Sequence, residues 1–155
     1  MINELLIPKG YIRACIKYKD NTTKILLFKN QVLNKGKSFL ARCLLEEYKG
    51  TLYIANMLFG DGGTVNGTPK DVSPSVESLN GVTRIKKSVI SQIDPESPME
   101  AIFTVIIGEE EGNDFTINEM GLELSDGSLF SLSTFADFNK TDQMEVAWGW
   151  NIAFM

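Results

Sequence analysis

The clearest pattern of hydrophobic and polar positions lies at the end of the chain, in residues 144–154. Large apolar side chains occupy every second position from Met144 to Phe154, and they include Trp148 and Trp150. A period of two places such side chains on one face of a β-strand. Burying the large apolar face of this segment contributes roughly 10 kcal/mol in gross terms, at about 25 cal/mol per Å². We therefore predict an interior strand here.

The same period predicts a β-hairpin over residues 11–33. Apolar residues from Ile12 to Tyr18 alternate with mostly basic ones, and an Asp-Asn-Thr sequence at 20–22 supplies a turn. The returning strand, 25–33, has apolar side chains on both of its faces. We therefore expect this strand to be covered on both sides.

A helical period follows in residues 35–48, with Asn34 as the expected N-cap and Gly50 as the C-terminal stop. The predicted buried stripe of this amphipathic helix comprises Leu40, Cys43, Leu44 and Tyr48. The apolar run at 51–59 is typical of a buried strand. Residues 60–81 are rich in Gly, Pro, Asn, Asp and Ser, which predicts a long ordered surface loop.

The rest of the chain predicts β-structure throughout. Strands are expected at 82–93, 99–107, 115–124, 129–132 and 144–154, with a hairpin turn at Asp126-Gly127. About seven or eight strands with one N-terminal amphipathic helix predict a mainly β fold, either a β-sandwich or a partly closed barrel. We expect one domain, 1–155, made of a hairpin arm (1–33), a helix (34–50) and a β core (51–155).

The composition excludes several classes of catalytic and metal-binding site. The 155 residues are 43% hydrophobic and contain no histidine, which removes Ser-His-Asp and Cys-His nucleophile pairs and the H-E-x-x-H zinc motif. Cys15 and Cys43 have no metal-ligand spacing and are expected as reduced core residues. No apolar run is long enough to span a membrane, and no signal peptide is apparent. We predict no enzyme, cofactor or metal site.

Charge is distributed unevenly along the chain. Residues 1–50 carry a balance of +6 and residues 51–155 one of −11, for a net charge of −5. The lysines are not interleaved with stacking aromatics, so nucleic acid is not the expected partner. One interpretation is that they are solvated strand faces. Another is that the basic and acidic parts pack against copies of the chain or charged neighbours.

Several residues are assigned to a structural motif: Gly60, Asp61, Gly62, Glu119, Gly121, Trp148 and Trp150. The glycines around Asp61 are interpreted as permitting positive φ after a buried strand, since one carboxylate is too little for a metal site. Glu119 is expected to be semi-buried and to accept hydrogen bonds from backbone N–H groups or from a lysine. The acidic run 109–111 with Asp114 is interpreted as a solvated turn in preference to a calcium site.

Phe138-Asn139-Lys140-Thr141 and four further segments resemble parts of virion proteins of tailed bacteriophages. These four are Asn30–Leu44, the strand ending in Phe59-Gly60-Asp61-Gly62-Gly63, the Asn118-Glu119-Met120-Gly121-Leu122 block with its Asp-Gly hairpin, and the closing Trp150–Phe154. The chain is similar there to the small β-rich attachment module of tail, collar or baseplate fibre proteins. Residues 1–29 lie outside the resemblance.

The resemblance implies a structural subunit of a tailed-phage virion, assembled in the bacterial host cytoplasm. It would bind other virion proteins as a tail, collar, neck or baseplate adaptor, with or without anchoring a fibre, and would use no catalytic residue and no membrane. No shaft follows Met155, which favours a separate adaptor over a fibre.

We expect a homo-oligomer or ring in which the basic hairpin meets the acidic segment 109–114 of a neighbour, by strand addition or surface contact. The candidate interface residues are Lys17, Lys19, Lys24, Leu26 and Phe28. The alternative is a carbohydrate- or ligand-binding β-sandwich that recognises a host surface. That function would use exposed aromatics such as Tyr11, Tyr53 or Phe135.

Overall fold

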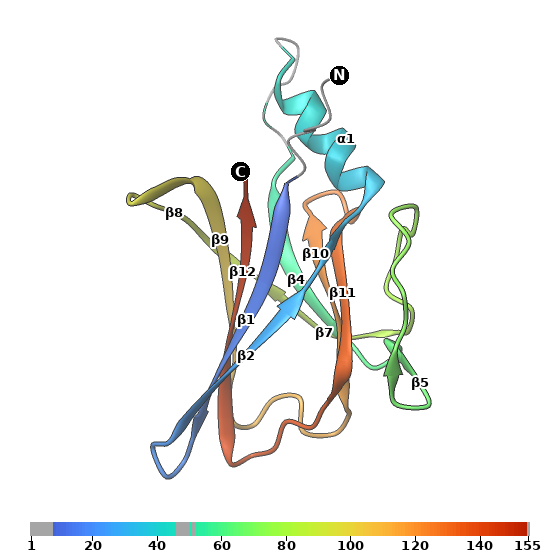
Figure 1. The fold of residues 1–155 in the computed structure, drawn as a ribbon. Helices are drawn as coiled ribbons and strands as arrows, with labels where there is room; N and C mark the ends of the chain where they lie inside the picture. The colour runs from blue at the N-terminus through green and yellow to red at the C-terminus, as the bar shows by residue number, and fades with distance from the viewer. Residues whose placement is uncertain (1–7, 46–49, 51, 155) are drawn as a thin grey trace.

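A computed structural model describes residues 8–45, 50 and 52–154, and nearly all of its regular structure is β (Figure 1). The strands are β1 (Lys9–Tyr18), β2 (Thr23–Lys29), β3 (Gln31–Val32), β4 (Ile54–Gly60), β5 (Thr64–Val65), β6 (Thr68–Pro69), β7 (Thr83–Ser88), β8 (Ile90–Asp94), β9 (Ser97–Ile107), β10 (Ile117–Leu124), β11 (Leu129–Phe138) and β12 (Met144–Ala153). Sheet A has the order β2-β1-β12-β9-β8, and sheet B has the order β3-β11-β10-β4-β7. Strands β5 and β6 form a separate pair.

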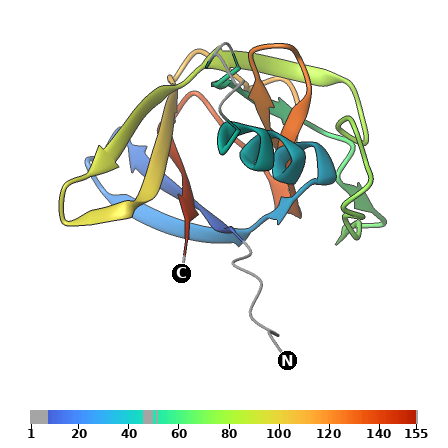
Figure 2. The same cartoon turned by 90° about the horizontal axis from the view of Figure 1, so that it is seen from above.

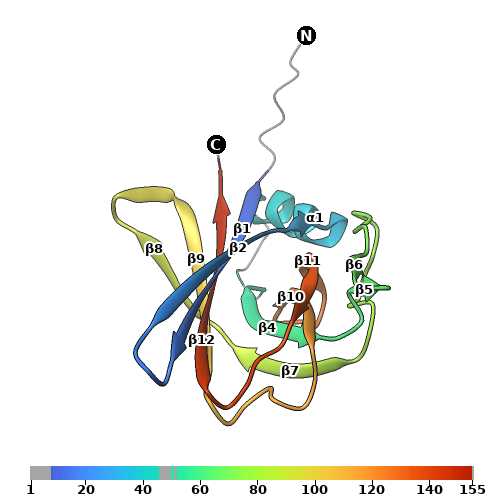
Figure 3. The same cartoon turned by 60° about the horizontal axis from the view of Figure 1, so that its bottom comes forward.

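The two large sheets contribute to one shared hydrophobic core. Views from above and from below place β1 and β12 on one side of the molecule and β10 and β11 on the other (Figures 2 and 3). The core joins Ile12 and Trp148 of sheet A to Phe59 and Leu122 of sheet B. The ring centroids of Phe59 and Trp148 are 5.4 Å apart, so the sheets are in direct contact through aromatic side chains.

The predicted interior strand at the C-terminal end is confirmed as β12. It pairs antiparallel with β1 on one side and with β9 on the other. Both of its indoles, Trp148 and Trp150, are 0% exposed. In the amide orientation of Asn30 that satisfies the groups around it, its side-chain oxygen accepts a hydrogen bond of 3.0 Å from Trp150 Nε1. Four phenylalanine rings surround the other indole: Phe28, Phe59, Phe135 and Phe138.

The predicted hairpin is also confirmed, as β1 and β2. Its turn has Asn21 at a φ of 67°, and the Asp20 carboxylate accepts a hydrogen bond of 2.9 Å from the N–H of Thr22. The prediction that the second strand is covered on both faces is wrong, because Ile25 is 50% exposed and Leu27 is 70% exposed. Strand β2 is an edge strand, and only its other face packs on the core.

The predicted helix exists, but it follows three strands and is therefore not N-terminal. It is α1 (Asn34–Cys43), whose N-cap is Leu33 without a side-chain cap, so the assignment of Asn34 as N-cap is wrong. Among the residues that the structure describes, no helix combines the length and hydropathy needed to cross a membrane. The predicted C-terminal part of the helix includes residues 46–49, which lie outside the described residues.

Helix α1 packs through a stripe that shares only Leu40 with the described part of the predicted one, because Leu40 is partly buried against the core. Its buried residues are Gly36 and Phe39, whereas Leu44 is 87% exposed and Cys43 is exposed. A Cβ on Gly36 would overlap the backbone of Phe130. The helix therefore approaches β11 closely at a glycine, which a search for large apolar residues does not detect. Cysteine 15 is half-buried, so neither cysteine is a core residue as predicted.

Two strand predictions needed correction. The expected strand at 82–93 changes sheets at Val89, so that β7 lies in sheet B and β8 in sheet A. Strand β11 continues to Phe138, six residues past its predicted end. The described residues thus form twelve strands, more than the seven or eight expected. The mainly β class is confirmed, and the described strands form no closed barrel because both large sheets have edges.

Replacing the central indole tests the dependence of the fold on β12. We expect Trp148→Ala to lower the free energy of unfolding by about 3–5 kcal/mol, because it leaves a cavity inside the phenylalanine cluster. Urea denaturation followed by circular dichroism measures this change. The control is Tyr53→Ala, at an aromatic residue that is 61% exposed, which should change stability by no more than about 0.5 kcal/mol. Equal losses in the two variants would contradict the assignment.

Candidate protein-interaction surface

Glu119 is a fully buried carboxylate on β10 that holds the segment 60–81 against sheet B. Its Oε1 accepts hydrogen bonds from the backbone N–H groups of Gly62 at 3.1 Å and Gly81 at 2.8 Å. Its Oε2 accepts from the backbone N–H of Asn80 at 2.8 Å and from the Asn80 side chain at 3.1 Å. A buried charge needs such donors to offset its lost hydration. One side chain therefore fixes both ends of the long segment.

The glycines around Asp61 serve close approach, and the interpretation that they permit positive φ is wrong. Positive φ occurs at Gly50, Gly67, Gly112 and Gly127. A Cβ on Gly62 would overlap the backbone of Gly81, and one on Gly60 would lie 2.8 Å from Glu119 Oε1. Gly121 lies similarly close to Leu129. Asp61 itself forms an ion pair of 3.0 Å with Arg84.

The acidic turn after β9 is built around a lysine that sequence reasoning missed. Lys140 is 2% exposed. Its ammonium group donates to the carbonyl oxygens of Glu109 and Thr141, both at 3.1 Å, and to Asn113 Oδ1 at 2.9 Å. Burial lowers the pKa of Lys140, and the neighbouring acids, chiefly Glu111, oppose that effect. Within the described part of the chain, no group of three or more acidic or cysteine side chains is arranged to hold a metal ion.

A second lysine neutralises the same turn from sheet B. The Lys87 Nζ lies 2.7 Å from Glu111 Oε1 and 2.9 Å from its Oε2. The hydrogen bond from Lys87 lowers the pKa of Glu111 below the ordinary value of a glutamate. The turn is therefore balanced within the chain, at least in part, by lysines that come from distant segments.

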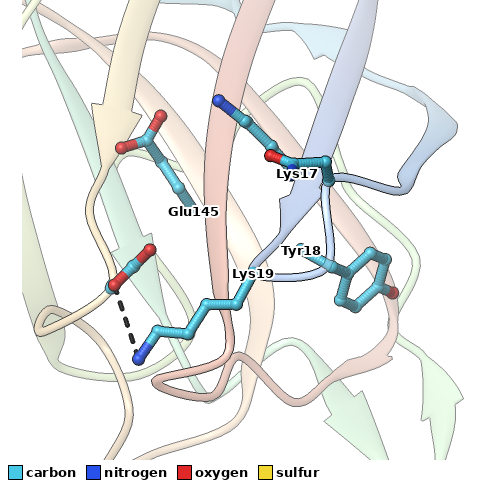
Figure 4. Close-up of a pocket in the computed structure, with 6 residues that line it drawn as sticks. Lys17, Tyr18, Lys19 and Glu145 are labelled. Atoms are coloured by element: carbon cyan, nitrogen blue, oxygen red, sulfur yellow. Dashed lines mark ion pairs between the residues drawn. The ribbon is translucent and has the colours of Figure 1, made fainter.

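The basic hairpin and the acidic turn lie side by side in one molecule. Lys19 Nζ and Glu109 Oε2 are 3.6 Å apart, and both side chains are 45% exposed. Figure 4 shows this ion pair at a shallow hollow that Lys17, Tyr18 and Glu145 also line. A contact between the hairpin of one chain and the turn of another would have to compete with this internal pair.

Two of the candidate interface residues on β2 lie on the inward face of the strand and not on its exposed face. Leu26 and Phe28 pack on the core, and the Phe28 ring stacks on Phe135 at 4.3 Å. The exposed apolar side chains of β2 are instead Ile25 and Leu27. Lys24 is exposed and is paired in register with the inward-facing Ile16.

The aromatics of the alternative ligand-binding function are not gathered into one site. Phe135 is 4% exposed and belongs to the core cluster. Tyr11 donates a hydrogen bond of 3.0 Å to Glu100, and burial is the largest cause that raises its pKa. Tyr53 is 61% exposed and precedes β4 of the other sheet. No stacking platform for a sugar is formed by these three residues.

The side of sheet A that faces away from the core carries both apolar and charged side chains, and we call it the outer face of sheet A. The strand register, with alternate residues pointing outward, assigns these outward positions to it: Thr23, Ile25, Leu27 and Lys29 of β2, Lys9, Tyr11, Arg13, Cys15 and Lys17 of β1, Glu145, Ala147, Gly149, Asn151 and Ala153 of β12, Glu100, Ile102, Thr104 and Ile106 of β9, and Ile90 and Gln92 of β8. Four large members are at least half exposed: Ile25, Leu27, Ile90 and Ile106. Large apolar side chains exposed on one face of a sheet favour its use as an interaction surface.

Removing the charge of the buried glutamate tests its role in fixing the long segment. We expect Glu119→Gln to lower the free energy of unfolding by about 1–3 kcal/mol, because the amide NH₂ cannot accept from the N–H donors it faces. Chemical denaturation measures the change. The control is Glu77→Gln in the same segment, where the side chain is 72% exposed and the expected change is about 0.5 kcal/mol or less. A Glu119→Gln chain as stable as this control would refute the role.

The depressed pKa of Glu111 predicts part of the acid sensitivity. A carboxyl group whose pKa is lower in the folded state stabilises the fold above its unfolded pKa, which is about 4.3 for glutamate. This stabilisation is lost as the pH falls through the folded pKa. Glu111→Gln should therefore be less stable than the wild type at pH 7, with the difference shrinking below about pH 4. Denaturation curves from pH 7 to pH 3 measure it, with Glu110→Gln as the control. A constant difference at all pH values would contradict the prediction.

The comparisons with known proteins identify a family. The family described as phage tail-collar fibre protein, N-terminal, matches residues 28–153. The match begins inside β2 and ends at the last residue of β12, so it spans both large sheets except for β1 and the start of β2. No curated protein and no solved structure matches the chain. The resemblance to tailed-phage attachment modules is confirmed, and the chain belongs to the phage tail-collar fibre protein N-terminal family.

Proposed function

We propose that the chain is a structural subunit of a phage tail that acts by binding other virion proteins. Its place would be that of a tail, collar, neck or baseplate adaptor, including one that anchors a fibre. Family membership supports the tail and the structural role. The proposed function needs no catalytic group and no cofactor, only complementary surfaces.

The outer face of sheet A is the observation that carries this proposal. Leu27 on β2 and Ile90 on β8 lie at opposite edges of this face and are 70% and 73% exposed. The small residues Ala147 and Gly149 lie on β12, between these two strands. Burying one such leucine or isoleucine against a partner contributes about 1.5–3 kcal/mol. The core that sheet A shares with sheet B supports this face from behind.

We place docking on this face in preference to strand addition at β2. The edge strand carries Lys24 and Lys29, and both are exposed. Charged side chains on edge strands oppose pairing with another strand. The apolar side chains Ile25 and Leu27 project from the sheet and not along its edge, so they favour a partner that covers the face.

A charge placed on this face should prevent incorporation into particles. We expect Leu27→Glu to lower the amount of protein per purified particle about tenfold or more, since each 1.4 kcal/mol of lost affinity is tenfold. The measurement is complementation of a phage that lacks the chain, followed by quantitative immunoblotting of sedimented particles. The matched control is Val82→Glu, at an apolar residue that is 68% exposed next to β7 of the other sheet.

Thermal unfolding of both purified variants shows whether each retains the fold. Normal incorporation of a folded Leu27→Glu chain would contradict docking through this face. Absence of the wild-type chain from particles would contradict the structural role itself. Specific binding to a glycan array by the wild-type chain would support the alternative, a ligand-binding β-sandwich.

A further inference from the structure

We propose that the edge strand β8 binds an extended segment of a different virion protein, which adds to sheet A as a further strand beside an apolar groove. This inference rests on the proposed role as a subunit that binds other virion proteins, and it names the binding site and the chemistry of the partner segment. Three observations support it: an uncharged open edge, exposed apolar side chains on both faces of that edge, and the groove next to it.

Three of the four sheet edges are protected against pairing with another chain. In the described part of the chain, the edge strands are β2 and β8 in sheet A and β3 and β7 in sheet B. Strand β2 carries Lys24 and Lys29, and β7 carries three bases that form ion pairs with acids of other segments. Strand β3 has only two residues. Charged side chains and short length are devices that oppose strand addition.

Strand β8 has neither of these devices. It is five residues long, and residues 90–93, Ile-Ser-Gln-Ile, are uncharged. Its one acid, Asp94, lies at the turn, where the Oδ1 atom accepts a hydrogen bond of 2.9 Å from the N–H of Glu96. An edge strand presents a row of N–H and C=O groups that have no partner in the sheet. Because another extended backbone matches the spacing of this row, the edge favours an extended partner segment.

The side chains of β8 leave apolar surface exposed on both faces of sheet A. Figure 3 shows the β8–β9 hairpin extending from one side of the molecule. Ile90 points to the outer face and is 73% exposed, whereas Ile93 points to the inner side and is 62% exposed. A strand added at this edge would lie about 4.8 Å from β8. Its side chains would therefore cover both isoleucines as cross-strand neighbours.

An apolar groove of about 300 Å³ adjoins the inner side of β8. Ser91 of β8 lines it, together with Phe103 of β9, Leu40 of α1, Tyr53 and Phe154. None of the residues that line this groove is charged. In strand addition, main-chain hydrogen bonds give affinity, and pockets for alternate side chains give specificity. The groove therefore favours a segment whose side chains on the inner side are apolar.

A second copy of the chain fits this edge less well than a segment of another protein. The described edge strands of a copy are the same four, of which two carry bases and one has two residues. Only β8 itself would offer an uncharged edge. Pairing of β8 with β8 is therefore the competing arrangement, and the experiments below distinguish it from the proposed one.

A lysine at the groove tests the edge without changing the outer face of sheet A. We expect Ser91→Lys to lower the amount of protein per purified particle about tenfold or more in the complementation assay, because a charged edge opposes strand addition. Ser91 is exposed, so thermal unfolding should stay unchanged. The matched control is Thr83→Lys, at an exposed residue of the basic edge strand β7, which should enter particles normally.

Normal incorporation of a folded Ser91→Lys chain would overturn the proposal. If Leu27→Glu is excluded from particles at the same time, the proposed function stands and only strand addition at β8 fails. A wild-type chain that forms dimers in sedimentation equilibrium, with the dimer lost in Ser91→Lys, would also overturn it in favour of pairing between two copies.

Photo-cross-linking in assembled particles identifies the partner of the edge. With p-benzoylphenylalanine in place of Ile93, we expect a cross-link to a segment of a different virion protein, located by mass spectrometry. The same label in place of Glu77, whose side chain is 72% exposed, should not give that product. A cross-link only to another copy of the chain, or no cross-link, would overturn the proposal.

Amide hydrogen exchange separates strand addition from a contact made by side chains alone. Alternate N–H groups of residues 90–93 point away from β9, and we expect them to exchange fast in the free chain and slowly in particles. Equal exchange of these amides in the free and the assembled chain would overturn the proposal.

Discussion

The rest of the structure depends on the burial of one face of β12 between two sheets. Trp148 is 0% exposed and is surrounded by phenylalanines that come from β2, β4 and β11. Because these strands belong to both sheets, one side chain joins the N-terminal hairpin, sheet B and the last strand into a single core. Burial of large aromatic surface is the dominant favourable contribution in such a core. The outward surfaces are then held rigidly in place by the strands that this core orders.

The parts of the fold predicted correctly are those whose signal is local. The alternation of apolar residues that predicts β12 lies within one segment. The Asp126-Gly127 turn depends only on a glycine, which adopts a φ of 89°. The predicted strand 129–132 ended just before Ser133, a buried serine of β11 whose hydroxyl donates to the carbonyl oxygen of Lys29. A polar residue satisfied by a strand a hundred positions away cannot be distinguished from a turn residue by its neighbours alone.

Only part of the candidate site was predicted, because the rest depends on contacts between residues that are far apart in the sequence. The sequence marked Glu119 as a carboxylate in need of donors, but the donors lie 38 to 57 residues away, at the two ends of one long segment. Lys140 carried no signal at all, because Glu109 and Asn113 become its neighbours only when the acidic turn folds against the connection between β11 and β12. The face of β2 was misjudged because an apolar run fits either side, and only pairing with β1 decides between them.

Folding rearranges the uneven charge of the sequence over the surface of sheet A. The sequence suggested two oppositely charged ends, yet Lys19 meets Glu109 within the chain and both lie at the same end of sheet A. What remains separated is the charge across the sheet, with bases on β1 and acids on β12 and β9. Antiparallel pairing of the first and last strands thus converts a gradient along the sequence into a gradient across one surface.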